Sequence, residues 1–181
     1  MGEKLVRKVA YTGIMAGLTA LGAWIRVPLW PVPVTLQVFF VLLSGAILGP
    51  RLGALSQGVY LGLTFVGLPL SASGGGPGVA LSPTFGYLAG FPAAAWLVGR
   101  LEGEGFTRRS LAMLSGLGLI YLTGLTYLWF YFRYIAHIPR HVSELLWLGL
   151  LPFIPGDLAK VALASYVAGR LGRLGGFWRD R

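Results

Sequence analysis

Two opposite charges stand three residues apart in a segment that is otherwise apolar. Asp157 and Lys160 lie in the stretch LPFIPGDLAKVALASYVAG, which spans residues 151–169. Because residues at i and i+3 share one face of a helix, their side chains are expected to be neighbours. An ionised side chain in the middle of a membrane helix costs roughly 2.5–3.5 kcal/mol, and less near the membrane surface. The pair therefore indicates either a structural ion pair near the surface or a site that offers a polar ligand one acceptor and one donor.

The position of the pair in its predicted helix favours one of the two charges and disfavours the other. Pro155 favours a first-turn position, so the helix is expected to begin near it. Asp157 then lies at the positive end of the helix dipole, whereas Lys160 lies where the dipole disfavours a cation. Lys160 therefore needs an anion, either Asp157 or a ligand. Since ionisable residues inside membrane helices usually mark functional sites, a ligand site is favoured.

Other kinds of chemistry have little support in the residues. The chain has no cysteine, which excludes disulfides, thiolate metal sites and cysteine nucleophiles. The stretch SASGGGPG at 71–78 lacks the GK[ST] ending of a phosphate-binding loop, so this chain is not expected to hydrolyse ATP. His137 and His141 are separated by Pro139, with no cluster of carboxylates or cysteines beside them. Neither a metal nor a cofactor is expected, and an enzyme is not the favoured class.

The composition is typical of a membrane protein. Hydrophobic residues make up 55% of the 181 residues and charged residues 12%, with a mean hydropathy of +0.71. Soluble domains carry about a quarter charged residues. The formal net charge of +9 does not indicate nucleic-acid binding, because the basic residues are spread over short loops and chain ends.

Six apolar segments, separated by Pro and Gly, are predicted to be transmembrane helices. Their approximate ranges are 6–25, 34–49, 51–68, 84–101, 110–134 and 155–171. A short helix lying at the membrane surface is expected between the fifth and the sixth. The N-terminal segment resembles a signal peptide but is interpreted as a retained first helix, since no soluble domain follows it. The prediction is an all-α integral membrane protein with residues 1–181 in a single domain.

The distribution of Lys and Arg orients this helical protein. With the N-terminus inside, the cytoplasmic side receives most of the 15 basic residues: Lys4, Arg7, Lys8, Arg51, Arg100, Arg108, Arg109, Arg170, Arg173, Arg179 and Arg181. The outer side receives Arg26, Arg133 and Arg140. This asymmetry places both termini in the cytoplasm. The Pro-rich loop 26–34, the Gly-rich loop 69–83 and the start of the sixth helix then lie outside. Trp129, Tyr131 and Tyr134 form an aromatic belt at the outer end of the fifth helix.

The first predicted helix carries small residues at a helical spacing. These are Gly13, Ala16, Gly17 and Ala20. Small residues at i, i+3, i+4 and i+7 let another helix approach closely. By itself the pattern predicts helix packing, either within this chain or with a partner.

Three blocks of sequence together resemble one family of transport proteins. They are PVPVTLQVFFVLLSGAILGPRLGALSQGVYL at 31–61, GLPLSASGGGPGVALSPTFGYLAGF at 67–91 and FIPGDLAKVALA at 153–164. In order and spacing they resemble the BioY family, the biotin-specific S components of energy-coupling factor (ECF) transporters. The resemblance covers nearly the whole chain and is loose only over 102–150.

The resemblance implies a six-helix protein in the cell membrane of a prokaryote that captures biotin from the outside. It implies three partner chains, namely a transmembrane coupling (T) subunit and two cytoplasmic ATPase subunits. The small residues of the first helix resemble the family's docking surface for the coupling subunit. The ATPases would supply the energy that this chain lacks.

The resemblance also implies site residues, which come from three blocks of sequence. The PGDxxK block matches at Asp157 and Lys160, and the TLQ block supplies Gln37 and Thr35. The PTxGY block supplies Thr84, Gly86 and Tyr87. Gln37 is equally consistent with ligand contact and with a hydrogen bond between helices.

The chain departs from the family at two places. Some members have an Asn in the Gly-rich loop and an Arg just after the Gly-Tyr pair, and here these places hold Gly74 and Leu88. Ligand contacts from those side chains are therefore absent. Backbone amides of the loop, at Gly75 and Gly76 in particular, are expected to replace them.

The chemistry of biotin agrees with these residues. Asp157 can accept from the ureido N–H groups, and Lys160 can donate to the ureido oxygen or to the carboxylate. Tyr87 is expected to wall the bicyclic ring, since binding pockets are mostly apolar with a few placed polar groups. For Trp24 and Trp30, anchoring at the membrane surface is favoured over ligand contact. Three alternatives to biotin capture stay open: an S component for another vitamin, a small membrane enzyme with Asp157 as base, and a purely structural membrane protein.

Overall fold

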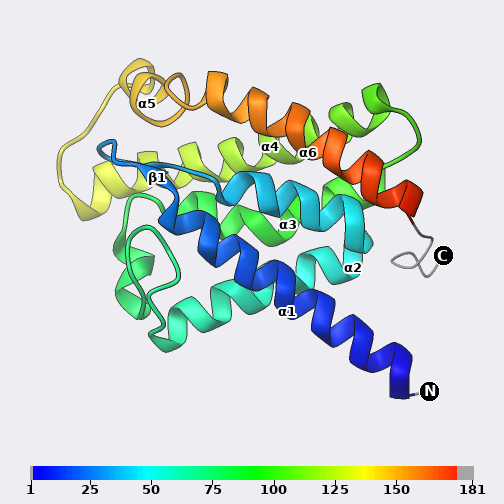
Figure 1. Ribbon diagram of the computed structural model, residues 1–181. Helices are drawn as coiled ribbons and strands as arrows, with labels where there is room; N and C mark the ends of the chain where they lie inside the picture. Colours follow the sequence, from blue (N-terminus) through cyan, green and yellow to red (C-terminus); the bar gives the residue numbers. More distant parts are fainter. Residues whose placement is uncertain (1, 175–181) are drawn as a thin grey trace.

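The computed structural model describes residues 2–174, and the side chains of residues 2–171. The elements run in the order α1 Gly2–Trp24, β1 Arg26–Val27, β2 Val34–Thr35, α2 Gln37–Val66, η1 Pro77–Leu81, α3 Phe85–Leu101, α4 Phe106–Phe130, η2 Tyr131–Ile135, α5 Val142–Gly149 and α6 Ile154–Leu174. Within this part of the chain, six long helical segments run between two opposite ends of the bundle: α1, two arms of α2, α3, α4 and α6 (Figure 1).

Helix α2 is a hairpin of two antiparallel arms. Gly49 lies in the left-handed region with φ 77° and is followed by Pro50, which cannot donate a helical hydrogen bond. The chain folds back there. A hydrogen bond between the two arms shows this: Gln37 Nε2 donates to Tyr60 Oη at 2.5 Å although the two residues are 23 positions apart. The predicted helices at 34–49 and 51–68 are thus confirmed as the two arms.

The bend of α2 packs directly against α3. A Cβ atom on Gly99 would lie 2.5 Å from the backbone of Gly49 and Pro50. A larger residue at position 99 would therefore push α3 away from the bend. Close approach of backbones through small residues is common in membrane helix bundles.

Helices α3 and α4 form the next antiparallel pair. A Cβ atom on Gly86 would meet the Tyr127 side chain and would lie 2.6 Å from the Thr123 carbonyl oxygen of α4. The last turn of α4 continues as the π-helical segment η2, which contains the buried Phe132. Together these residues match the predicted helices at 84–101 and 110–134.

The chain then returns through α5 into α6, whose axes are bent by 49° relative to each other. These helices correspond to the predicted short helix within 137–151 and the predicted helix at 155–171. Pro155 lies in the first turn of α6, as the sequence predicts, and Asp157 lies in the same turn.

Two short elements were not predicted. The Pro-rich loop folds back on itself so that β1 and β2 pair antiparallel, with Arg26 opposite Thr35 and Val27 opposite Val34. The Gly-rich loop contains the 3-10 helix η1. Both elements are too short for an alternation or helical period to show in the sequence, because each is set by pairing or packing of a few residues.

Two continuous segments within residues 2–174 are long and apolar enough to cross a membrane, namely α2 and 106–135, and the bent pair α5–α6 meets the same criterion when taken together. Large apolar side chains of α1, α3, α4 and α6 point outward and are exposed, as expected where lipid replaces water. The molecule is a multi-pass membrane protein.

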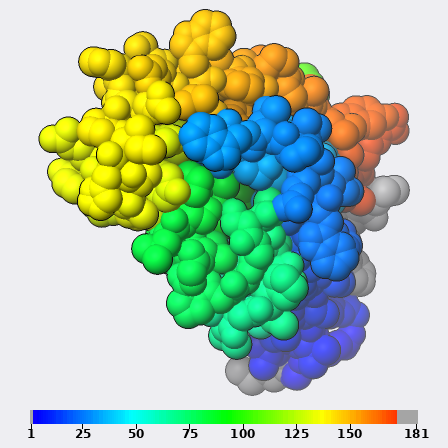
Figure 2. Space-filling view, turned by 90° about the vertical axis from the view of Figure 1, so that its left-hand side faces the viewer, coloured from blue at the N-terminus to red at the C-terminus, as the bar shows by residue number. Residues whose placement is uncertain are grey.

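The two ends of the bundle differ in character. We call one the loop end: it carries β1, β2, the loop 67–84 and the segment 131–153, which meet in Figure 2. We call the other the basic end: it carries the start of α1, the bend of α2 and the α3–α4 connection (Figure 1). The basic residues of these three segments gather at the basic end, in agreement with the predicted cytoplasmic side. Arg179 and Arg181, which contribute to that prediction, lie outside the described residues.

Candidate binding site

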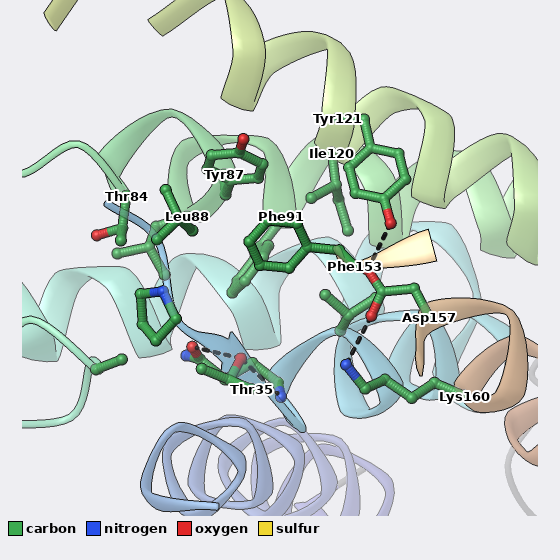
Figure 3. Close-up of a pocket in the computed structure, with 15 residues that line it drawn as sticks. Thr35, Thr84, Tyr87, Leu88, Phe91, Ile120, Tyr121, Phe153, Asp157 and Lys160 are labelled. Atoms are coloured by element: carbon green, nitrogen blue, oxygen red, sulfur yellow. Dashed lines mark hydrogen bonds and ion pairs between the residues drawn. The ribbon is translucent and has the colours of Figure 1, made fainter. Parts of the chain in front are cut away.

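A pocket lies at the loop end, between the N-terminal ends of α2, α3 and α6 and the middle of α4 (Figure 3). Its lining residues are Val32, Pro33, Thr35, Gln37, Val38, Ala72, Thr84, Tyr87, Leu88, Phe91, Ile120, Tyr121, Phe153, Asp157 and Lys160. Six residues predicted from the sequence are among them: Asp157, Lys160, Gln37, Thr35, Thr84 and Tyr87. Segments distant in the sequence thus converge on one cavity.

The carboxylate of Asp157 is the centre of the polar side of the pocket. Lys160 Nζ lies 2.6 Å from Asp157 Oδ1, and Tyr121 Oη donates to Asp157 Oδ2 at 2.7 Å (Figure 3). The side chain of Asp157 is 3% exposed and that of Lys160 is 12% exposed. Each carboxylate oxygen has a second lone pair, so Asp157 can still accept a hydrogen bond from a ligand.

The ion pair is formed within one turn of α6 and is completed from another helix. Spacing of three residues brings Asp157 and Lys160 together on the face that points into the pocket. Tyr121 reaches them from the middle of α4. Because a buried carboxylate needs compensating charge and hydrogen bonds, the three side chains form one unit.

Gln37 connects the two arms of α2 at the edge of the pocket. Its Nε2 donates to Tyr60 Oη, and its Oε1 accepts from Thr35 Oγ1 at 3.2 Å. Tyr60 Oη in turn lies 3.4 Å from the carbonyl oxygen of Leu70. The sequence allows Gln37 either a hydrogen bond between helices or contact with a ligand. In the structure it makes the hydrogen bond between helical segments and also lines the cavity.

Thr84 belongs to a cluster of hydroxyl groups beneath the Gly-rich loop. Its Oγ1 lies 2.9 Å from Ser73 Oγ and 2.6 Å from Ser82 Oγ, and the two serine hydroxyls are 3.0 Å apart. These bonds join the loop to the start of α3. Thr84 is the member of the cluster that faces the pocket.

Tyr87 contributes its ring rather than its hydroxyl. The phenol donates to the carbonyl oxygen of Gly149 at 2.7 Å and so ties α3 to α5. Its ring lies 6.4 Å from that of Phe153, and together with Phe91 and Leu88 they make an apolar wall. The cavity therefore suits a ligand with an apolar body and a few polar atoms at the Asp157 side.

The two glycines predicted as ligand contacts have other contacts in the structure. Gly75 and Gly76 do not line the pocket. The amide of Gly76 already donates to the Thr64 carbonyl oxygen at 2.7 Å, and a Cβ atom on Gly75 would clash with the backbone of Leu68. Both glycines hold the loop against the end of α2. Trp24 and Trp30 are also outside the lining and are strongly exposed, in agreement with anchoring at the membrane surface.

Gly86 is likewise a packing residue. It faces α4 and is absent from the pocket lining. Thr35, in contrast, lines the pocket beside Gln37.

Tyr121 is the polar pocket residue that the sequence analysis missed. One signal for it exists in the sequence. The aromatic residues at 129–134 stand at a helix end, where an interfacial belt is expected, whereas Tyr121 stands in the middle of the apolar segment 110–134. A hydroxyl at that depth needs a partner, but only the tertiary structure identifies this partner as Asp157.

The four small residues predicted as the docking face of α1 do not all point the same way in the structure. Gly13 and Gly17 are exposed, with open space where a Cβ atom would be. Ala16 and Ala20 are buried in the core and cannot be part of an outer docking surface. The exposed small residues in the middle of α1 are instead Ala10, Gly13 and Gly17, at spacings of three and four.

Comparison with known sequences places this architecture in one family. The model of the BioY family matches residues 1–176. The "Biotin transporter BioY" of Thermotoga maritima is 40% identical over 172 residues, which cover 93% of this chain and 98% of the relative. The "Probable biotin transporter BioY" of Pyrococcus horikoshii is 40% identical over 166 residues, which cover 91% of this chain and 96% of the relative.

A solved structure agrees with the sequence comparison. The crystal structure of an S-component for biotin from an ECF-type ABC transporter superposes with a TM-score of 0.84 and is 27% identical, with 98% of this chain and 96% of that chain covered. The shared helical arrangement, the family match over 1–176 and the two relatives lead to the same conclusion: this membrane protein belongs to the BioY family.

Proposed function

We propose that the chain is the substrate-binding S component of an ECF-type transporter and that it captures biotin at the loop end. The observation that carries the proposal is the unit of Asp157, Lys160 and Tyr121, set in an otherwise apolar pocket of a BioY-family fold. A membrane transport protein that binds its cargo unchanged has no need of a nucleophile or metal, and its role is not enzymatic.

The arrangement of polar groups fits the ligand's two kinds of surface. The second lone pairs of Asp157 can accept N–H groups of a ureido ring, and Lys160 Nζ can donate to its oxygen or to a carboxylate. The rings of Tyr87, Phe91 and Phe153 supply the apolar wall for the thioether ring. Thr84 offers a hydroxyl from the side of the Gly-rich loop.

Biotin binding to the purified protein in detergent tests this proposal. Wild type is expected to bind, and Asp157→Asn and Lys160→Ala are each expected to weaken binding by roughly 10- to 150-fold, since hydrogen bonds to charged groups contribute about 1.5–3 kcal/mol. Glu144→Gln is the matched control, because Glu144 pairs with Arg140 on the surface of the loop end at 3.2 Å and is absent from the pocket lining. Absence of biotin binding by folded wild type would reject the biotin assignment, and tight binding of another vitamin would replace it.

Transport needs partners in addition to this pocket. We propose that a transmembrane coupling subunit docks on α1 and that two cytoplasmic ATPase subunits supply the energy. The exposed residues Ala10, Gly13 and Gly17 form the surface on α1 where a partner helix can approach closely.

Substitution of one exposed glycine tests the docking surface. Gly17→Leu is expected to abolish co-purification with the coupling subunit while leaving biotin binding intact. Gly118→Leu on α4 is the control, because Gly118 is equally exposed and has equally open space around it. Equal loss of assembly in both variants would contradict a docking role specific to α1.

A further inference from the structure

The basic end contains a second, larger cavity that the proposed transport function does not use. It has a volume of about 1160 Å³ and lies between the start of α1, the bend of α2, the end of α3 and the start of α4. We call it the inner cleft. Its cationic side chains are Lys4, Arg7, Lys8, Arg51, Arg100 and Arg108, and its acidic ones are Glu102 and Glu104.

The positive charge of the inner cleft is only partly compensated by the protein, although Arg7 forms an ion pair with Glu3. Glu102 is nearly buried, and its carboxylate is bound by Arg109 Nε at 3.0 Å. Within residues 2–174, the side chains of Arg51, Arg100 and Arg108 have no hydrogen bond or ion pair to a protein group. Four helices thus bring cations together that repel one another, and an anion in the cleft would relieve this repulsion.

The chemistry of these side chains selects the type of anion. Arginine presents a planar fork of N–H donors that matches a phosphate group, and several arginines around one cavity can surround its oxygens. Positive-inside orientation puts the cleft at the cytoplasmic surface of the membrane, where anionic lipid headgroups are concentrated.

The rim of the cleft favours a lipid over a soluble phosphate. Leu5, Val6 and Val9 of α1 are exposed beside Lys4 and Lys8, and Leu101 and Phe106 are exposed beside Arg100 and Arg108. These apolar side chains offer contact to acyl chains directly next to the cationic groups. A free phosphate would make no contact with these apolar side chains.

We propose that the inner cleft binds the phosphate headgroup of an anionic phospholipid from the cytoplasmic leaflet. The cations on four different helices hold the headgroup, and the exposed apolar residues of α1, α3 and α4 contact its chains. This site is separate from the pocket at the loop end and does not depend on which solute that pocket binds.

Native mass spectrometry of the full chain in neutral detergent tests the proposal, with phosphatidylglycerol or phosphatidylcholine added as the probe. Wild type is expected to bind phosphatidylglycerol at least tenfold more tightly than phosphatidylcholine. Arg51→Gln and Arg100→Gln are each expected to weaken this binding by roughly fivefold, and the double variant by about 25-fold, because each cation near an anionic headgroup contributes a factor of that size. High salt is expected to weaken wild-type binding, since exposed charges are screened.

Arg133→Gln provides the matched control, because Arg133 is also an exposed arginine but belongs to η2 at the loop end. It is expected to leave phosphatidylglycerol binding unchanged. Three results would overturn the proposal: equal retention of the two lipids, an equal loss in Arg133→Gln, or displacement of the lipid by inorganic phosphate at similar concentration, which would indicate a site for a soluble anion. Loss of coupling-subunit assembly in the double variant without any change in lipid retention would likewise overturn it and assign the cleft to a protein partner.

Discussion

The pocket at the loop end and the inner cleft both contain charged side chains, but these side chains differ in burial and in whether the protein supplies their partners. In the pocket, Asp157 and Lys160 are nearly buried, and both carboxylate oxygens have protein partners. In the inner cleft, Arg51 and Arg100 are exposed, and no ion pair is found for either within the described residues. The difference follows from solvent access: a charge removed from water needs partners from the protein, whereas a charge at the membrane surface can use water or a bound anion.

The comparison has a functional consequence. A pre-organised, internally paired site can discriminate among solutes, because a wrong ligand leaves buried polar groups without partners. An exposed cluster of cations attracts any suitable anion and is sensitive to salt. The first arrangement suits selection of a cargo, and the second suits contact with a membrane surface.

The largest effect on stability is expected when one partner of the buried ion pair is removed. Asp157→Ala leaves the Lys160 ammonium buried without an anion, and the free energy of unfolding is expected to fall by about 3–5 kcal/mol. Titration with a denaturing detergent in mixed micelles measures this change. The double variant Asp157→Ala with Lys160→Met is expected to recover much of the loss, because no unpaired charge remains. If the double variant is as unstable as the single one, the charge pair is not the cause.

An intermediate effect is expected at the hydrogen bond from α4. Tyr121→Phe removes the donor to Asp157 Oδ2 but keeps the ring, so it should weaken biotin binding by roughly tenfold or more, in line with about 1.5–3 kcal/mol for a hydrogen bond to a charged group. Calorimetric titration with biotin measures it.

Tyr11→Phe is the control for that measurement, since Tyr11 lies at the basic end and lines the inner cleft. Unchanged affinity in Tyr121→Phe would show that Lys160 alone is sufficient to hold Asp157 in place.

The smallest effect is expected in the inner cleft. Arg51→Gln in detergent free of anionic lipid should change the free energy of unfolding by no more than about 0.5 kcal/mol, the range usual for exposed positions without special contacts. The same mixed-micelle titration provides the value. A loss as large as that of Asp157→Ala would mean that Arg51 is held by contacts within the protein, and the contrast between the two regions would disappear.

Several features of the fold and the site could be predicted because they depend on local spacing. Asp157 and Lys160 meet because they are three residues apart on one helix. The helical segments follow from runs of apolar residues broken at Gly49–Pro50 and similar places, and the basic end follows from the positions of Lys and Arg. Asp157, Lys160, Gln37, Thr84 and Tyr87 were found through motifs that also match the BioY family.

Other features were decided by packing between distant segments. Tyr121 joins Asp157 only because α4 lies beside α6, and neither residue indicates the other in the sequence. Gly75 and Gly76 are predicted as ligand contacts from the sequence, but only the structure shows that they pack the loop on the end of α2. The face of α1 was assigned as one stripe, although Ala16 and Ala20 point into the core and Gly13 and Gly17 point outward.

The sequence by itself therefore determined the membrane character, the helical segments, the orientation and the charged pair, because each depends on composition or on neighbours along one helix. The tertiary structure alone decided which side chains complete the pocket, which glycines serve packing, and that cations from four helices surround one cleft. The physical reason is the same in each case: side-chain period along a helix fixes relative directions within that helix, whereas contacts between helices depend on how their surfaces fit together.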